Sequence, residues 1–162
     1  MVGMRARQLA RLARGQRGLF TRADARRCGF SDGQIRRRIA AGEWRGVVGS
    51  VSTVGSARLS QAQLDLAVQL AVPGSVLTGP AAAREWGMPV DDDRIMLVVG
   101  SRRLVRVPGV LVVYGSLGPR EVVLSDGARV TRRERARSST ACGFSPSDRG
   151  STSSSALGDS AG

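Results

Sequence analysis

The sequence of 162 residues contains no lysine, no histidine and no asparagine. Without histidine there is no imidazole for general-base catalysis, for a Ser-His-Asp triad or for metal ligation. Without lysine there is no P-loop lysine and no Schiff-base amine, and a nuclease centre built on clustered carboxylates lacks its usual basic partner. These absences predict a protein that binds and does not catalyse, with no cofactor and no metal.

Cysteines and long apolar runs are also scarce. Cys28 and Cys142 are too few for a disulfide framework, which favours a reduced, cytoplasmic chain. Apolar runs such as residues 95–99 and 110–114 are far too short to span a bilayer, and the N-terminus lacks the apolar stretch of a signal peptide. We therefore expect a cytoplasmic protein without a membrane partner, folded as one ordinary domain or two small ones.

Arginine is what the chain has in excess. All 25 basic residues are arginines, and with 13 acids the net charge is +12. Residues 1–45 hold 12 arginines and only 3 acids, so +9 of the net charge lies in this segment. Such a balance favours a polyanionic partner, either nucleic acid or an acidic membrane surface.

The basic segment carries helix patterns and helix-start signals. Leu9 and Ala13 lie at helical spacing, with arginines on the other faces, which predicts a first helix. Thr21, followed three positions later by Asp24, is typical of an N-cap and predicts a second helix over residues 22–28.

A third helix is predicted over residues 32–41. Ser31 and Gln34 have the spacing of a capping box, in which each side chain bonds the other's backbone amide. Gly29 ends the second helix, so a short turn joins the two helices into a helix-turn-helix. The third helix would then enter a DNA major groove by its N-terminal end.

The faces of this third helix follow from its few apolar residues. Ile35 and Ile39 are its only large apolar side chains, so we expect both to face the core. Arg37 then points almost directly away from the core.

Residues 43–52 predict the wing of a winged helix. Val47 and Val51 flank Gly49 and Ser50, a pattern that favours two short strands. We expect Trp44 to pack this wing onto the third helix at Ile39.

These stretches, in their order along the chain, resemble the N-terminal winged-helix domain of AbiEi-type antitoxins of type IV toxin–antitoxin systems. The resemblance lies in residues 18–22, 31–39 and 42–45, continues through residues 75–88 and 127–131, and covers about residues 5–135. One departure is in the wing, where residues 49–52 read Gly-Ser-Val-Ser in place of the family's usual Pro-Gly-Val-Tyr.

The resemblance implies a repressor that recognises repeats at its own operon promoter, so the expected partner is double-stranded DNA. It also implies a following domain that neutralises or communicates with a nucleotidyltransferase-like toxin, which makes a cognate toxin a second expected partner. The pattern selects no particular oligomeric state.

The middle of the chain predicts a small α/β domain with an antiparallel sheet. Helices are predicted over residues 60–71 and 80–86, and strand patterns follow at residues 95–99, 110–114, 121–124 and 128–130. The fold class is therefore α+β. We expect a winged helix-turn-helix over residues 1–55, the α/β domain over 56–135 and a disordered tail over 136–162.

The predicted tail is rich in serine and has hardly any periodic apolar residues. A disordered linker is the simple interpretation. A shifted reading frame beginning near residues 135–136 would instead encode a Leu-rich segment like the family's next helix, so we also expect a truncated or frameshifted C-terminus. Sequencing of the locus would test this.

The candidate DNA-binding residues all lie in or beside the helix-turn-helix. Gln34, Arg36 and Arg37 are expected to approach bases or phosphates, because arginine pairs with guanine and glutamine with adenine. Arg38 flanks the buried stripe, and Ser31 caps the helix. The phosphate-neutralising set is Arg22, Arg26, Arg27 and Arg45.

Two alternatives remain beside this interpretation. The arginines could form only a solvated face, although solvation alone would not require two capped helices. The chain could also be a protein-binding antitoxin in which the winged helix is vestigial.

Overall fold

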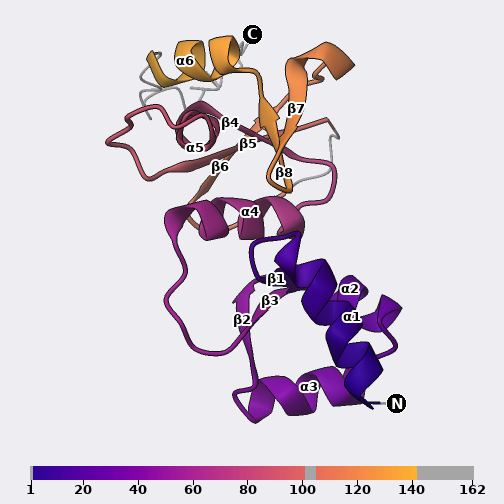
Figure 1. The fold of residues 1–162 in the computed structure, drawn as a ribbon. Helices are drawn as coiled ribbons and strands as arrows, with labels where there is room; N and C mark the ends of the chain where they lie inside the picture. The colour runs from indigo at the N-terminus through magenta and orange to yellow at the C-terminus, as the bar shows by residue number, and fades with distance from the viewer. Residues whose placement is uncertain (1, 101–104, 142–162) are drawn as a thin grey trace, which may run out of the picture.

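The computed structural model describes residues 2–100 and 105–141. They form two units, one around each of two β-sheets, and Figure 1 shows the units stacked with helix α4 (Gln61–Ala71) between them. The α+β class predicted from the sequence is confirmed.

The N-terminal unit contains three helices and a three-stranded antiparallel sheet in the order β1-β3-β2. Its elements are α1 (Val2–Arg14), β1 (Leu19–Thr21), α2 (Arg22–Arg27), α3 (Asp32–Ala40), β2 (Trp44–Val48) and β3 (Val51–Val54). The predicted helices and the predicted strand pair are present. Strand β1 was not predicted: it is only three residues long and exists because it pairs with the distant residues 51–53 of β3.

Both predicted capping boxes are present. The Thr21 side chain accepts a hydrogen bond from the Asp24 amide, and the Ser31 side chain accepts one from the Gln34 amide. Gly29 follows α2 with a φ of 88°, the left-handed conformation that favours glycine. The turn between α2 and α3 is therefore fixed by local chemistry.

Three aromatic rings form the core of the N-terminal unit. Trp44 meets Phe20 and Phe30 edge-on, at ring-centroid distances of 4.9 and 5.1 Å. Ile35 is buried in the same cluster, but Ile39 is 41% exposed. The expectation that Ile39 faces the core and supports Trp44 is therefore wrong, because the two phenylalanine rings fill that place.

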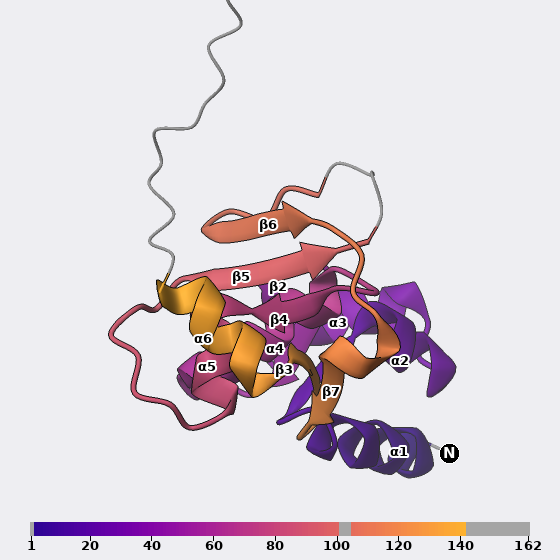
Figure 2. The same ribbon diagram turned by 90° about the horizontal axis from the view of Figure 1, so that it is seen from above.

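The second unit has a five-stranded sheet in the order β6-β5-β4-β8-β7. Its remaining elements are β4 (Val76–Thr78), α5 (Gly79–Glu85), β5 (Ile95–Val99), β6 (Val110–Tyr114), a 3-10 turn (Pro119–Glu121), β7 (Val122–Ser125), β8 (Ala128–Thr131) and α6 (Arg133–Ala141). Figure 2 shows α6 and α5 together beside this sheet.

The second sheet is mixed, which corrects the predicted antiparallel arrangement. The pairs β4–β5 and β7–β8 are antiparallel, whereas β5–β6 and β4–β8 are parallel. Alternating apolar runs carry no information on strand direction. The short β4 was also missed, and it supplies the parallel partner for β8.

Helix α6 extends to Ala141, so residues 136–141 of the predicted disordered tail are helical. Ala136 is fully buried and anchors the start of this segment. The predicted boundary at residue 136 is therefore too early. The remainder of the predicted tail, residues 142–162, lies outside the described residues.

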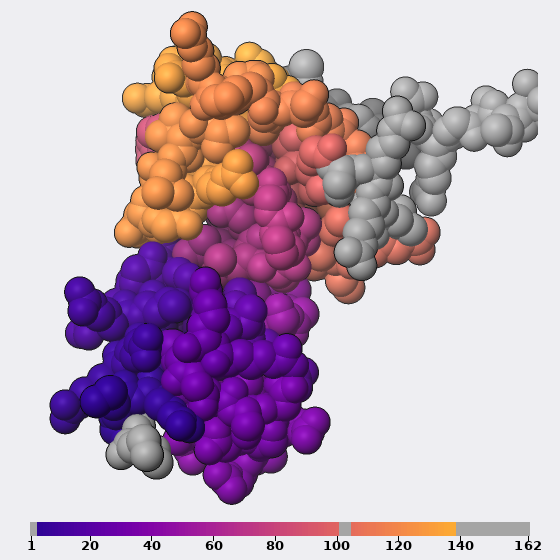
Figure 3. Space-filling view, turned by 90° about the vertical axis from the view of Figure 1, so that its right-hand side faces the viewer, coloured from indigo at the N-terminus to yellow at the C-terminus, as the bar shows by residue number. Residues whose placement is uncertain are grey.

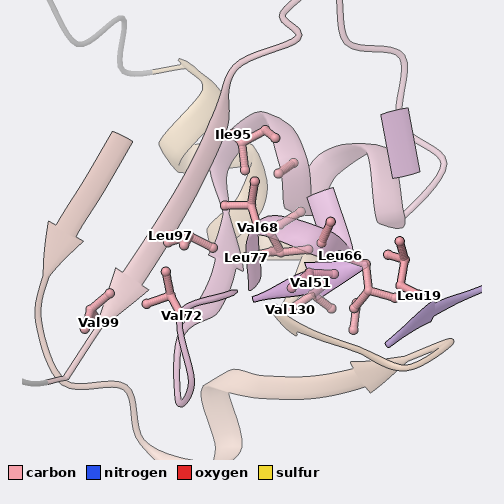
Figure 4. Close-up of a cluster of buried hydrophobic side chains, with 14 of the residues drawn as sticks. Leu19, Val51, Leu66, Val68, Val72, Leu77, Ile95, Leu97, Val99 and Val130 are labelled. Carbon is pink, nitrogen blue, oxygen red and sulfur yellow. The ribbon is translucent and has the colours of Figure 1, made fainter. Parts of the chain in front are cut away.

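One hydrophobic core joins the two units. Figure 4 shows Leu19 and Val51 of the N-terminal sheet in the same cluster as Leu66, Leu77 and Val130 of the second unit. Helix α4 contacts strands of both sheets, which explains why its residues 65–69 are all buried.

Polar contacts reinforce this junction. The Arg17 guanidinium makes two hydrogen bonds to Glu85, of 2.6 and 2.7 Å, and one of 3.0 Å to Asp126. The Gln63 side-chain amide donates to the backbone carbonyl of Arg17. The space-filling view in Figure 3 shows the units in contact along this boundary.

Candidate nucleic-acid interface

Helix α3 presents an outward face of small and basic residues. Ile35 is buried, whereas Gly33, Arg36, Arg37 and Ala40 are exposed. Gly33 has no side chain and Ala40 has only a methyl group, so a ligand can approach the helix closely at these positions. The face therefore combines close approach with two guanidinium groups.

Arg36 and Arg37 have their donors available. Among the described residues, neither guanidinium makes a hydrogen bond or an ion pair. Each guanidinium carries five N–H donors in a planar fork that matches phosphate oxygens or the O6/N7 edge of guanine. These two predicted site residues are the best placed for a ligand.

Ser31 and Gln34 are occupied by the helix start. The Gln34 amide oxygen accepts from the Ser31 backbone N–H at 2.9 Å, and the Ser31 hydroxyl accepts from the Gln34 backbone N–H at 3.3 Å. A bidentate contact from glutamine to adenine needs both the amide oxygen and the amide nitrogen. With the cap intact, Gln34 and Ser31 serve to fix the N-terminus of α3.

Arg22 and Arg26 share one carboxylate on the side of α3 that faces α2. Asp32 accepts from Arg22 at 3.0 Å and from Arg26 at 2.9 and 2.6 Å. The hydrogen bonds from Arg26 and Arg22 lower the pKa of Asp32 to about 2. The pair of arginines is thereby held in place at the start of α3, with a net charge of about +1 for the three groups.

Arg27 and Arg38 are each paired with an acid. Arg27 bonds Asp24; burial raises the pKa of Asp24, but hydrogen bonds from Thr21 and Arg27 outweigh it, and the net effect lowers that pKa. Arg38 bonds Glu43 and lies 5.4 Å from the ring centroids of both Phe30 and Trp44. Arg38 therefore also holds the aromatic core against α3.

Arg45 lies on β2, apart from the helix-turn-helix cluster. Its guanidinium donates to the backbone carbonyl of Ala57 at 2.7 Å, which ties β2 to the segment leading into α4. The structure therefore gathers most of the predicted set around α3 but directs Arg45 to the linker.

Sequence reasoning missed the contribution of α1. Its Arg5 guanidinium donates to the Gly29 carbonyl at 2.9 Å, so it reaches the turn between α2 and α3. Arg7, Arg11 and Arg14 are exposed on the same helix. The sequence shows that α1 is rich in arginine, but which of these side chains reach the helix-turn-helix depends on how α1 packs.

A comparison with protein-family models finds one family over residues 7–45. Its description is "Transcriptional regulator, AbiEi antitoxin". The match spans most of α1, all of α2 and α3, and the start of β2, and it confirms the predicted family resemblance over this segment. No curated protein matches the chain. Within the part of the chain that the structure describes, no helix is both long and apolar enough to cross a membrane.

Proposed function

We propose that this chain is a DNA-binding transcriptional regulator of the AbiEi antitoxin type, which represses its own toxin–antitoxin operon from the cytoplasm. In this proposal the N-terminal unit acts as a winged helix-turn-helix, and α3 is the recognition helix. The observation that carries the proposal is the exposed face of α3, where Arg36 and Arg37 lie beside Gly33 and Ala40 and have no partner within residues 2–100 and 105–141. The family match over residues 7–45 covers this same region.

The arginines divide into two roles under this proposal. Arg36 lies on the outward face and contacts a base edge, where a bidentate pair with guanine contributes about 1–3 kcal/mol of discrimination. Arg22 and Arg26, held by Asp32, approach the phosphates on the side of the groove next to α2. The chain binds and does not catalyse, in keeping with its lack of lysine and histidine.

The test is an electrophoretic mobility shift with duplex DNA from upstream of the gene and with a random duplex of equal length. Arg36→Gln should weaken binding to the upstream duplex and reduce its preference over random DNA. Arg120→Gln is the matched control, because Arg120 is exposed in the second unit, far from α3. No shift of the wild-type chain at low salt would overturn the proposal.

A second candidate is an antitoxin that binds its toxin directly. Two outer strands of the second sheet favour it: Leu124 on β7 is 72% exposed and Tyr114 on β6 is also exposed. Apolar side chains on outer strands are typical of protein contacts. A stable complex with the product of the adjacent gene, without a DNA shift, would favour this candidate over the first.

A further inference from the structure

A small hollow lies beside Gln34 and Arg38, which helical spacing places on the opposite side of α3 from Asp32, the partner of Arg22 and Arg26. It has a volume of about 70 Å³ and is lined by Phe30 and by polar side chains from two helices. The polar residues are Arg5 from α1 and Gln34, Arg37 and Arg38 from α3. The side chains of three arginines therefore line one hollow beside the proposed recognition helix.

Arg5 is held at this place by a specific contact. Its Nη1 donates to the carbonyl of Gly29, and a Cβ at Gly29 would lie 3.2 Å from the Arg5 Nε. The glycine therefore serves the close approach of Arg5 as well as the left-handed turn. This is the one side-chain hydrogen bond that Arg5 makes to the described residues, so four of its five N–H donors remain for a ligand.

Of the three arginines that line the hollow, only Arg38 is paired with an acid in the part of the chain that the structure describes. Glu43 pairs with Arg38, the Gly29 carbonyl that holds Arg5 is neutral, and Arg37 has no partner among the described residues. On the opposite side of α3, by contrast, Arg22 and Arg26 already have Asp32. Two positive side chains beside one hollow attract an anion by Coulomb interaction. The hollow therefore has the chemistry of an anion site.

The geometry points to a phosphate-binding site in which Arg5 and Arg37 together hold one backbone phosphate of the DNA. Arg38 supports the wall of this site through Glu43, Phe30 and Trp44. The inference rests on the proposed DNA-binding function and deepens it by assigning residues that contact the second sugar–phosphate backbone of the groove. A major groove about 12 Å wide has one backbone on each side of an inserted helix. Arg22 and Arg26 face one backbone, and Arg5 and Arg37 face the other.

The salt dependence of DNA binding tests this site. Each phosphate contact contributes close to one unit to the slope of log affinity against log salt. Arg5→Gln should make the slope less negative by about one and weaken binding to upstream and random duplexes alike. Arg5→Lys keeps the charge and should keep the slope. Arg7→Gln is the matched control, because Arg7 is exposed on the same helix and does not line the hollow.

A second experiment assigns the phosphate. Neutral methylphosphonate is placed at one backbone position at a time along the upstream duplex. For the wild type, the substitution at one position beside the recognition-helix contact should lower the affinity relative to unmodified DNA. For Arg5→Gln, the same substitution should not lower the affinity further, because the contact with that phosphate is already lost. Circular dichroism of each variant checks that the helices are intact.

The outcomes separate the inference from the function it rests on. If the wild-type chain does not bind DNA, the proposed function fails and this site fails with it. If the wild type binds DNA, but Arg5→Gln has the wild-type salt slope and responds to methylphosphonate as the wild type does at every position, the site alone is refuted. Equal losses for Arg5→Lys and Arg5→Gln would also refute it, since charge would then not be the cause.

Discussion

The buried ion pair between Arg17 and Glu85 makes a sharp prediction about stability. The Arg17 side chain is 14% exposed and that of Glu85 only 4%, and the pair joins the loop after α1 to the end of α5. Glu85 raises the pKa of Arg17 through hydrogen bonding and charge, although burial opposes this, so the guanidinium stays protonated. We consider Arg17→Met, Glu85→Leu and the double variant.

The expected magnitudes differ between the two single variants. Arg17→Met leaves the Glu85 carboxylate buried without its cation, and removing one partner of a buried pair costs about 3–5 kcal/mol. Glu85→Leu should cost less, about 3 kcal/mol, because the Arg17 guanidinium keeps its hydrogen bonds to Asp126 at 3.0 Å and to the Ala62 carbonyl at 3.1 Å. The double variant replaces the pair with apolar groups and should cost less than either single variant.

Urea unfolding followed by circular dichroism measures these free energies. A double-mutant cycle gives the coupling between the two sites, which should be about 3 kcal/mol or more. The m-values should stay near that of the wild type, since the exposed area on unfolding hardly changes. A cost below about 1 kcal/mol for Arg17→Met, or additive single costs, would refute the reasoning.

Three further predictions concern single residues. Ser31→Ala removes the N-cap of α3 and should lower the free energy of unfolding by about 1 kcal/mol in the same assay, whereas Ser31→Asn should retain most of it. Asp32 has a pKa lowered to about 2, so its stabilising effect is complete above its ordinary pKa and is lost as the pH falls. The stability difference between wild type and Asp32→Asn should therefore shrink between about pH 4 and pH 2; a constant difference in acid-unfolding curves would contradict this. Gly127→Ala would place a Cβ 2.6 Å from the Gly15 carbonyl oxygen at a φ of 82°, so a lower Tm is expected, and an unchanged Tm would contradict that contact.

The parts of the fold that follow from local chemistry could be predicted from the sequence. Thr21 and Ser31 begin their helices as expected, because a cap needs only residues three positions apart. Strand β1 and the parallel pairing of β4 with β8 depend on partners at least thirty residues away. No local pattern records such pairings.

The candidate site shows the same division. The outward direction of Arg37 followed from helical geometry, and the structure confirms that it is exposed. The pairing of Arg38 with Glu43 and the approach of Arg5 to Gly29 could not be predicted, because both depend on how neighbouring elements pack. The misplaced Ile39 has the same cause, since Phe30 and Phe20 occupy the space around Trp44.

The core that Leu19 and Val51 share with Leu66 and Val130 limits how such a protein can evolve. A segment that gene fusion moves into another protein folds there only if its hydrophobic core is complete within the segment. A cut after residue 55 would instead expose Leu19 and Val51, which are fully buried in this structure, to water. Recombination that preserves folding must carry α4 and the second sheet along with the N-terminal helices. A substitution at a core residue of one unit therefore also changes the packing of core residues in the other.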